Sequence, residues 1–194
     1  MSVRWTLLRH GMTEGAQGFR GRLDVPLSEE GLMQMKDAAA ALDGYDCVVT
    51  SPLQRCARFA GEWARQNGLP LEIEADLREL DFGQWEGRTA AELMVDQAAD
   101  LGRFWDDPYG FTPPDGEPVA HFDRRIIKAM TRLTHRFAGQ RVLLVTHGGV
   151  IRLLLARARR LPRKDLLQVE AGYATCHPLA TILANGQLRL SEAT

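Results

Sequence analysis

Three short apolar runs along the chain end abruptly in polar residues. The runs and the residues that follow them are 3–8 with Arg9 and His10, 47–50 with Ser51, and 142–146 with His147. Short runs rich in Val and Leu are typical of strands that are buried on both faces of a sheet. The pattern therefore predicts three buried strands, each of which delivers polar side chains at its carboxyl end.

Helical spacing fills most of the chain between these runs. Helices are predicted at residues 28–44, 51–66, 89–105 and 150–159. Ser28 is interpreted as the N-cap of the first helix, and Gly44 as its end. Ser51 and Pro52 are interpreted as the N-cap and the first residue of the second helix. Strands thus alternate with helices along the chain.

The clearest predicted helix begins at Pro118. Its apolar residues recur every three or four positions and define one face of the helix: Val119, Phe122, Ile126, Met130, Leu133 and Phe137. His121 and His135 fall off this face, so we expect both to be exposed and neither to be a ligand.

Two further signals complete the predicted sheet. Residues 71–74 favour an edge-like strand, and Asn185–Gly186 between two apolar runs is the strongest short signal for a β-hairpin. The alternation predicts an α/β fold, a three-layer sandwich with a largely parallel central sheet, helices on both faces and a C-terminal hairpin. We expect one domain over residues 1–194, with a helical lid insertion at about 88–118.

Composition and charge narrow the functional classes. The 194 residues are 45% hydrophobic and have a formal net charge of −1, so no overall field attracts nucleic acid or an anionic membrane. The apolar N-terminal stretch is too short for a signal peptide, and Arg152 interrupts the apolar stretch 150–156. Three cysteines without metal spacing predict reduced thiols in a cytoplasmic protein. A basic cluster is interpreted as a solvated helix end: Arg157, Arg159, Arg160, Arg163 and Lys164.

Ligands of a parallel sheet bind outside the carboxyl ends of its strands, where the polar residues of the three strands would meet. His10 and His147 would share this edge with Arg9 and Arg55. Arginine beside a ligand repels a metal cation, and the chain has no H-x-x-x-H, C-x-x-C, G-x-S-x-G or phosphate-loop motif. Forked guanidinium donors instead suit a phosphoryl group, which a neutral histidine can accept covalently. We therefore expect no metal and no cofactor.

A set of motifs occurs in a fixed order along the chain. They are Arg9–His10–Gly11–x–Thr13, Ser51–Pro52–Leu53–x–Arg55, Leu77–x–Glu79, Phe82–Gly83–x–Trp85–Glu86–Gly87, Gly116–Glu117 and Thr146–His147–Gly148–Gly149. Over about residues 3–155, the set resembles the histidine phosphatase superfamily in its phosphoglycerate-mutase-like branch. The resemblance implies that His10 is the phosphorylated nucleophile and Glu79 the proton donor. The phosphate pocket that it implies consists of Arg9, Arg55, His147 and Gly148.

Glu79 has one rival as the proton donor. Asp81 lies two residues further on, but only Glu79 matches the Leu-x-Glu spacing of the family. Apolar neighbours such as Leu80 and Phe82 would favour the protonated carboxylic acid that a donor requires. Glu86 is expected to accept a hydrogen bond from a nearby backbone amide instead.

The short chain and the loop around Trp85 are most similar to the α-ribazole phosphatases of the superfamily. The resemblance implies that the partner is a small phosphomonoester, with α-ribazole 5′-phosphate in cobalamin biosynthesis as the expected substrate. The alternatives are a phosphoglycerate mutase, a broad-specificity phosphatase and a catalytically weak phospholigand-binding protein. Trp85, Trp105, Tyr109 and Phe111 would stack on a planar base or pack a lid. The sequence leaves a monomer and a homodimer open.

One position departs from the family pattern. Members often carry asparagine six residues after the nucleophile, where this chain has Ala16. The lost donor is worth about 1–3 kcal/mol if nothing replaces it. Thr13, Gln17 or a backbone amide between Gly18 and Gly21 is expected to substitute. Thr13, Gly21 and Trp85 are the expected substrate-binding residues.

Overall fold

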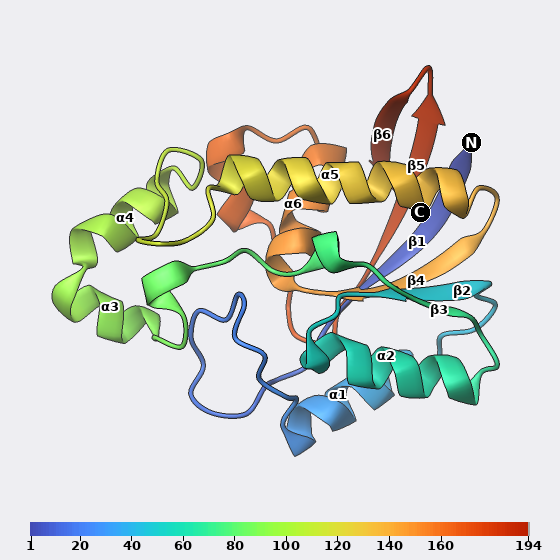
Figure 1. Cartoon of the computed structure of the whole chain (residues 1–194), viewed down its shortest axis with the longest axis horizontal. Coiled ribbons are helices and arrows are strands. Elements are labelled where there is room, and N and C mark those ends of the chain that lie inside the picture. The colour runs from blue at the N-terminus through green and yellow to red at the C-terminus, as the bar shows by residue number, and fades with distance from the viewer. Residues whose placement is uncertain (194) are drawn as a thin grey trace.

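The computed structural model describes residues 1–193, and a six-stranded sheet crosses it (Figure 1). The strands are β1 (Ser2–Arg9), β2 (Cys47–Thr50), β3 (Leu71–Ile73), β4 (Arg141–Thr146), β5 (Cys176–Ala184) and β6 (Gln187–Glu192). Their order in the sheet is β3-β2-β4-β1-β5-β6. The first four in this order are parallel, and β5 and β6 pair antiparallel. The predicted parallel sheet with a C-terminal hairpin is confirmed.

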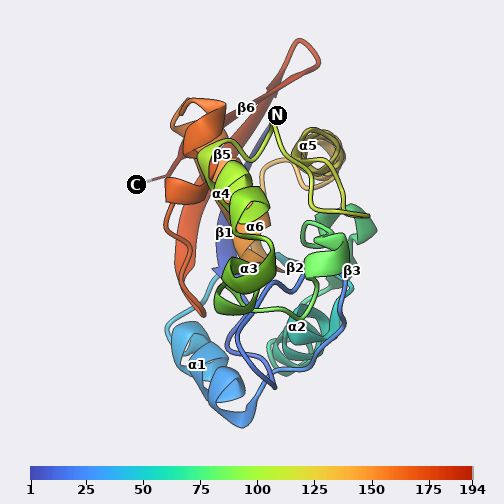
Figure 2. The ribbon, with the colours of Figure 1, turned by 90° about the vertical axis from the view of Figure 1, so that its left-hand side faces the viewer.

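Helices cover both faces of the sheet (Figure 2). One face carries α1 (Glu29–Ala39) and α2 (Gln54–Gln66), and the other carries α5 (Val119–Arg136) and α6 (Gly148–Ala158). In the central strand β4, Leu143 and Val145 join the core beneath α1 and α2, whereas Val142 and Leu144 join the opposite core. Side chains alternate along a strand, so consecutive apolar residues can fill two cores. The three-layer sandwich is confirmed.

Two helix boundaries differ from the sequence prediction. The helix α2 begins at Gln54 with Leu53 as its N-cap, and the hydroxyl of Ser51 accepts the N–H of Leu53 at 3.4 Å while it also bonds to His147. The helix α1 ends at Ala39 rather than at Gly44, and the connection to β2 uses the positive φ of Gly44, 65°. In both cases a tertiary contact or a turn overrides the local helical signal.

The helix predicted at 89–105 is in fact two short helices. The helices α3 (Ala90–Asp96) and α4 (Ala98–Asp106) meet at Gln97, whose side-chain oxygen accepts a hydrogen bond from Trp85 Nε1 at 2.6 Å. Thr89 and Glu92 form a capping box at the start of α3. Both helices protrude beyond the main body at one end of the molecule (Figure 1). That this segment closes over the site as a lid stays a prediction.

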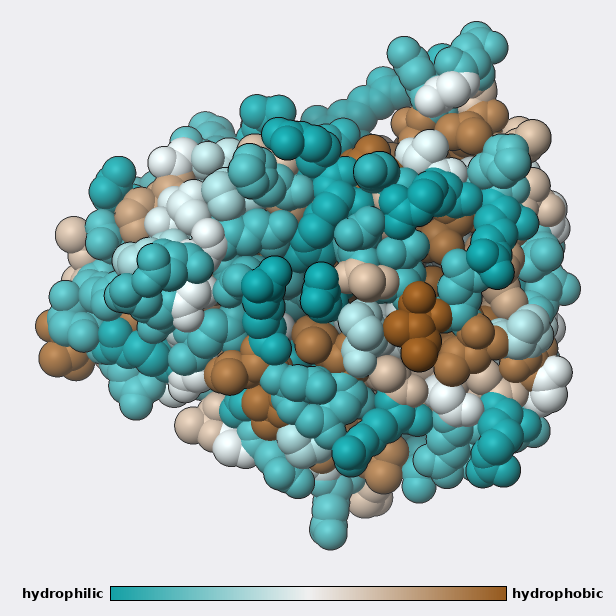
Figure 3. Space-filling view, viewed as in Figure 1, coloured by the Kyte–Doolittle hydropathy of each residue, from teal (hydrophilic) through white to brown (hydrophobic). Residues whose placement is uncertain are grey.

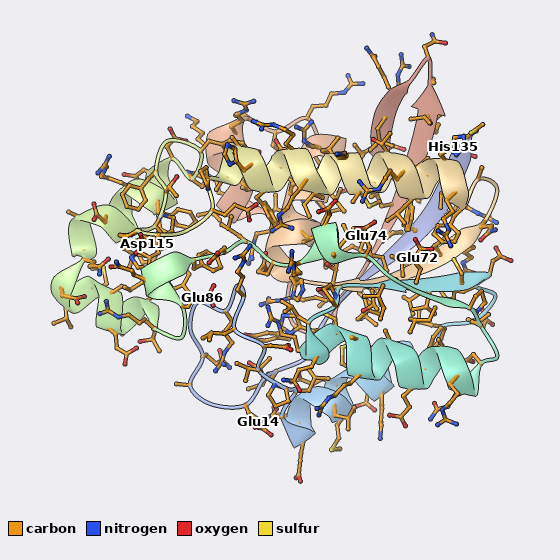
Figure 4. The ribbon with its side chains drawn as sticks, viewed as in Figure 1. Glu14, Glu72, Glu74, Glu86, Asp115 and His135 are labelled. Atoms are coloured by element: carbon orange, nitrogen blue, oxygen red, sulfur yellow. The ribbon has the colours of Figure 1, made fainter. Side chains whose placement is uncertain are left out.

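The remaining sequence predictions concern residues at the surface. His121 and His135 are exposed as predicted, and His135 lies at the far end of α5 (Figure 4). Asn185 and Gly186 have φ angles of 51° and 75°, as the predicted hairpin turn requires. The face in Figure 3 is mainly hydrophilic, with smaller apolar patches. Within residues 1–193, no helix combines the length and the apolar character needed to span a membrane.

Candidate active site

The polar residues that follow the parallel strands meet at one edge of the sheet, as predicted. Arg9 at the end of β1 lies opposite Thr146 at the end of β4, so His10 and His147 leave adjacent strands at the same level. Their ring centroids are 5.3 Å apart. A cavity of about 510 Å³ opens beside His10. Its lining includes Arg9, His10, Phe19, Arg20, Glu79, Phe82, Trp105, Phe122, Gly149, Arg152 and Tyr173.

The geometry of His10 leaves one ring nitrogen as a nucleophile. Nδ1 lies 2.8 Å from the carbonyl oxygen of Gly11, and because a carbonyl only accepts, Nδ1 carries the proton. Nε2 therefore carries a lone pair. Burial and the charge of Arg55 lower the pKa of His10 from 6.5 to about 3, so the ring is neutral at neutral pH. A neutral imidazole is the form that can attack phosphorus.

Arg9 presents an unsatisfied donor beside His10. Its Nη1 donates to the carbonyl oxygen of Ala171 at 2.6 Å, and its guanidinium lies 4.0 Å from the centre of the Tyr173 ring. Its Nε is the one buried side-chain nitrogen or oxygen in residues 1–193 that has no hydrogen-bond partner. A buried donor without a partner costs about 1–3 kcal/mol, a cost that an acceptor on a ligand would remove. The arrangement fits an anion in the cavity.

Arg55 and His147 are fully buried and lie behind His10. Arg55 Nε donates to His147 Nδ1 at 3.3 Å, and its other two nitrogens donate to carbonyl oxygens of the loop 20–23. His147 Nε2 in turn donates to the hydroxyl of Ser51 at 2.7 Å. In this conformation the pair fixes the loop against the sheet. Direct contact of either residue with phosphate, as the resemblance implies, stays a prediction, and Gly148 packs against Arg9 beside them.

Glu79 reaches the cavity at the N-terminus of α6. Its Oε2 accepts the backbone N–H of Gly149 at 2.8 Å, and its Oε1 accepts that of Leu80 at 2.9 Å. Leu80 and Phe82 line the cavity beside it, so the carboxyl group lies between apolar side chains and two backbone N–H donors. Arg125 of α5 holds the loop by donating to the carbonyl oxygen of Glu79 at 2.9 Å.

The other two acidic candidates of this region have structural contacts. Asp81 forms an ion pair with Arg22 at 3.1 Å and accepts the N–H of Gly83, and it does not line the cavity. Glu86 (Figure 4) accepts backbone N–H groups of residues 21–23 and of Phe82. The predicted structural role of Glu86 is confirmed.

Three residues predicted to contact the substrate lie outside the cavity lining. Trp85 is 0% exposed and its ring stacks on Phe111. The prediction that it binds substrate is wrong, because its ring is buried in the core. Thr13 forms an isolated β-bridge, and the N–H of Gly21 bonds to a carboxylate, so neither faces the cavity. Of the four aromatic residues proposed to stack on a base, Trp105 alone lines the cavity.

Among the cavity residues that sequence reasoning missed are Arg20, Arg152 and Tyr173. Arg20 donates to the carbonyl oxygen of Ala16, and Arg152 Nε donates to the carbonyl oxygen of Val169 at 3.0 Å. The three come from a loop, a helix and the segment before β5, so no spacing in the sequence links them. The available signal was that Arg20 lies in the same glycine-rich loop as Ala16, the position at which the family often carries asparagine.

The two buried histidines predict that acid destabilises the protein. Burial and the charge of Arg55 also lower the pKa of His147 well below 6.5. Below about pH 6.5 both rings take up protons in the unfolded chain but not in the folded protein, so stability is lost as the pH falls from there. We expect the drop in Tm between about pH 7 and about pH 4.5 to be smaller in His10→Asn than in the wild type. The exposed His135→Asn variant is the control, and an equal drop in all three proteins would contradict the prediction.

Comparison with known proteins agrees with this geometry. The model of the histidine phosphatase superfamily (branch 1) matches residues 5–190. A bifunctional protein of Mycobacterium tuberculosis is 39% identical over 161 residues, which are 80% of this chain but only 44% of that protein. The chain thus spans less than half the length of this relative. The adenosylcobalamin/α-ribazole phosphatase of Escherichia coli is 32% identical over 168 residues, which are 84% of this chain and 83% of that protein.

A solved structure has the same fold. The structure of a mycobacterial glucosyl-3-phosphoglycerate phosphatase is similar with a TM-score of 0.84 at 26% identity, and the match covers 100% of both chains. With the family match over nearly the whole chain, these findings show that the chain belongs to the histidine phosphatase superfamily.

Proposed function

We propose that this chain is a phosphomonoesterase that works without a metal through a phosphohistidine at His10. The observation that carries the proposal is a neutral His10 with a lone pair on Nε2, in a cavity that is also lined by Arg9, whose Nε has no hydrogen-bond partner. A phosphoryl oxygen that accepts from Arg9 would bring its phosphorus atom close to Nε2. Relatives that are named as phosphatases support the reaction class.

The reaction takes two steps. In the first, Nε2 of His10 forms a bond to phosphorus, the bond from phosphorus to the ester oxygen breaks, and Glu79 gives a proton to the departing oxygen. In the second, water attacks the phosphohistidine, Glu79 takes the proton of the water, and inorganic phosphate leaves. Arg9 stabilises the charge on the phosphoryl oxygens in both steps.

The cavity walls support α-ribazole 5′-phosphate as the substrate. Phe19, Phe82, Trp105 and Phe122 line the cavity, and the rings of Phe19 and Phe82 lie edge to face at 5.0 Å. Aromatic walls of this kind suit a planar base, which the α-ribazole leaving group carries. The Escherichia coli relative, named as an adenosylcobalamin/α-ribazole phosphatase, supports the same choice.

A second candidate substrate is a phosphoglycerate derivative. Arg20 and Arg152 add two guanidinium groups to the cavity beyond Arg9, and they suit a carboxylate on the leaving group. Glucosyl-3-phosphoglycerate has such a carboxylate, and a phosphatase named for it shares the fold. A phosphoglycerate mutase would use the same carboxylate, but it would transfer the phosphoryl group back to glycerate instead of to water.

A comparison of kcat/KM values tests the proposal and separates the candidates. The substrates are α-ribazole 5′-phosphate, glucosyl-3-phosphoglycerate and 3-phosphoglycerate, each assayed with EDTA present. We expect α-ribazole 5′-phosphate to have the highest value and every turnover to release inorganic phosphate. Exchange between the 2- and 3-positions of glycerate in excess of hydrolysis would instead establish a mutase, and activity lost with EDTA would refute the metal-free mechanism.

Removal of the Trp105 ring is expected to impair only substrates with a planar base. Trp105 is 47% exposed and lines the cavity, so it can stack on a base without first leaving the core. Stacking is worth about 1–3 kcal/mol per base, so Trp105→Ala should lower kcat/KM for α-ribazole 5′-phosphate by about 5- to 160-fold. Turnover of phenyl phosphate should change little. Met94→Ala, at an exposed position of α3, is the control, and a uniform loss on both substrates would exclude stacking.

Arg20 is expected to supply the donor that is missing at Ala16. Arg20 lines the cavity, and its guanidinium donates to the carbonyl oxygen of Ala16. The guanidinium therefore lies beside the position at which the family often carries asparagine. A hydrogen bond to a charged group is worth about 1.5–3 kcal/mol, so Arg20→Gln should raise KM by about tenfold or more. Adding Ala16→Asn to that variant should restore part of the loss. Arg22→Gln is the control. If Ala16→Asn does not lower the KM of the Arg20→Gln variant, Arg20 does not replace the donor that is missing at Ala16.

A further inference from the structure

A second cavity, larger than the one at the active site, opens beside the short helix η3 (Arg163–Gln168). Its volume is about 720 Å³, and its walls come mainly from the C-terminal end of α6, from η3 and from β6. The walls carry four arginines: Arg157, Arg160, Arg163 and Arg189. We call this cavity the arginine groove. Three of the four belong to the basic cluster that the sequence placed at a solvated helix end, whereas Arg159 of that cluster pairs with Glu192.

One arginine of the groove is fixed in its wall. Arg157 donates two hydrogen bonds, of 2.7 and 2.8 Å, to the carboxylate of Asp123, and the hydroxyl of Tyr109 donates to the same carboxylate at 2.9 Å. Asp123 is 5% exposed, and among residues 1–193 it is the only acidic residue that lines the groove. The single negative charge of the groove is therefore already balanced by Arg157.

The other three arginines bring uncompensated positive charge. Across the described part of the chain, Arg160, Arg163 and Arg189 form no ion pair with a carboxylate. Asp106 and Asp107 line a neighbouring cavity together with Arg163 but form no ion pair with it. The floor of the groove is apolar, because leucines of α6, η3 and β6 form it. Cationic walls over an apolar floor fit an anion with an apolar body.

Arg160 also holds a backbone conformation that favours glycine. It has a φ of 57° just after α6, where its N–H bonds to the carbonyl oxygen of Arg157 and the N–H of Leu161 bonds to that of Ala156. This is the Schellman motif, and glycine is the usual residue at the position of Arg160. A strained residue other than glycine at the edge of a cavity indicates that its side chain has a use.

We propose that the arginine groove binds a soluble anion with at least two phosphoryl groups on an apolar or aromatic body, about as large as a nucleoside diphosphate. Forked guanidinium donors match phosphoryl oxygens, and three uncompensated arginines match the charge of a diphosphate. The leucine floor takes the body of the ligand, and the volume of the groove lies within the range of small-molecule sites. His10 does not line the groove, which shares only Leu166 with the lining of the active-site cavity, and the proposal does not depend on the proposed hydrolysis.

Isothermal titration calorimetry with α,β-methylene-ADP tests the proposal, because the methylene bridge resists hydrolysis. The Arg9→Gln variant is titrated so that binding at the active site is weakened. We expect one site per chain in this variant, and binding about tenfold weaker or more when Arg160→Gly is added. Glycine suits the backbone at this position, so Arg160→Gly alone should raise Tm by about 2–4 °C and leave kcat/KM for hydrolysis unchanged.

Arg58→Gln on α2 is the matched control, since Arg58 is an exposed arginine outside the groove. It should leave the affinity unchanged. Absence of binding in the Arg9→Gln variant would overturn the proposal, as would an affinity that Arg160→Gly does not alter. Equal weakening by Arg58→Gln would also overturn it, because the ligand would then respond to overall positive charge rather than to a site.

Discussion

Replacement of His10 by alanine is expected to lower kcat for an aryl phosphate by about 10⁴-fold or more. Neither His147 nor Cys56, two buried nucleophilic side chains behind His10, is placed to replace it. The N–H at His147 Nε2 donates a hydrogen bond to the hydroxyl of Ser51, and burial raises the pKa of the Cys56 thiol, so that this thiol stays protonated. Release of the phenolate with EDTA present measures the effect. Wild-type turnover in the His10→Ala protein would refute the phosphohistidine mechanism.

A second readout separates loss of the nucleophile from loss of the fold. The wild-type protein, quenched during turnover of a ³²P-labelled substrate, should carry an acid-labile label, and the His10→Ala protein should carry none. His135→Ala is the control, because His135 is exposed at the far end of α5 (Figure 4). A wild-type chain that binds phosphate but acquires no label from any substrate would instead favour the weak phospholigand-binding protein.

The sheet could be predicted from sequence because its signals are local. The run at 142–146 is short, apolar and followed by His147–Gly148–Gly149, and the structure places it as the central strand β4. Asn185–Gly186 requires positive φ angles that few other pairs adopt, so it located the hairpin turn correctly. Ser51 shows where such signals fail. It has the composition of an N-cap, but its hydroxyl bonds to a histidine that is distant in sequence.

Part of the site could not be predicted, because it depends on which side chains are buried in the core and which remain exposed in the cavity. Trp85 and Trp105 look equivalent in the sequence, yet the core buries the first completely and leaves the second 47% exposed in the cavity. Arg20, Arg152 and Tyr173 reach the cavity from segments whose mutual distance only the tertiary structure sets. His10 and Arg9 could be located from the sequence, because they follow a predicted strand and a parallel sheet brings the carboxyl ends of its strands to one edge, regardless of the loops between them.

Replacement of Glu79 by glutamine is expected to lower kcat/KM by a factor that grows with the basicity of the leaving group. Glutamine keeps the size of the side chain and one acceptor oxygen for the N–H of Gly149, but it cannot donate an acidic proton. The value of kcat/KM reports the steps up to the departure of the leaving group and leaves out the second step, in which Glu79 acts as a base on every substrate. A general acid contributes about 10²–10⁴-fold, so kcat/KM for an alkyl phosphate such as α-ribazole 5′-phosphate should fall by about that factor. For p-nitrophenyl phosphate, whose phenolate leaves without a proton, the loss should be much smaller, and the ratio of the two kcat/KM values is the measurement.

Asp81→Asn provides the matched control for this prediction. Asp81 pairs with Arg22 and does not line the cavity, so its replacement should leave the ratio of the two kcat/KM values at the wild-type level. If Asp81→Asn changed the ratio and Glu79→Gln did not, Asp81 would be the proton donor. Equal losses on both substrates in Glu79→Gln would show that Glu79 acts on the nucleophile or the phosphoryl group. Because loss of a positioning contact lowers both rates alike, only a loss that follows the leaving group identifies proton donation.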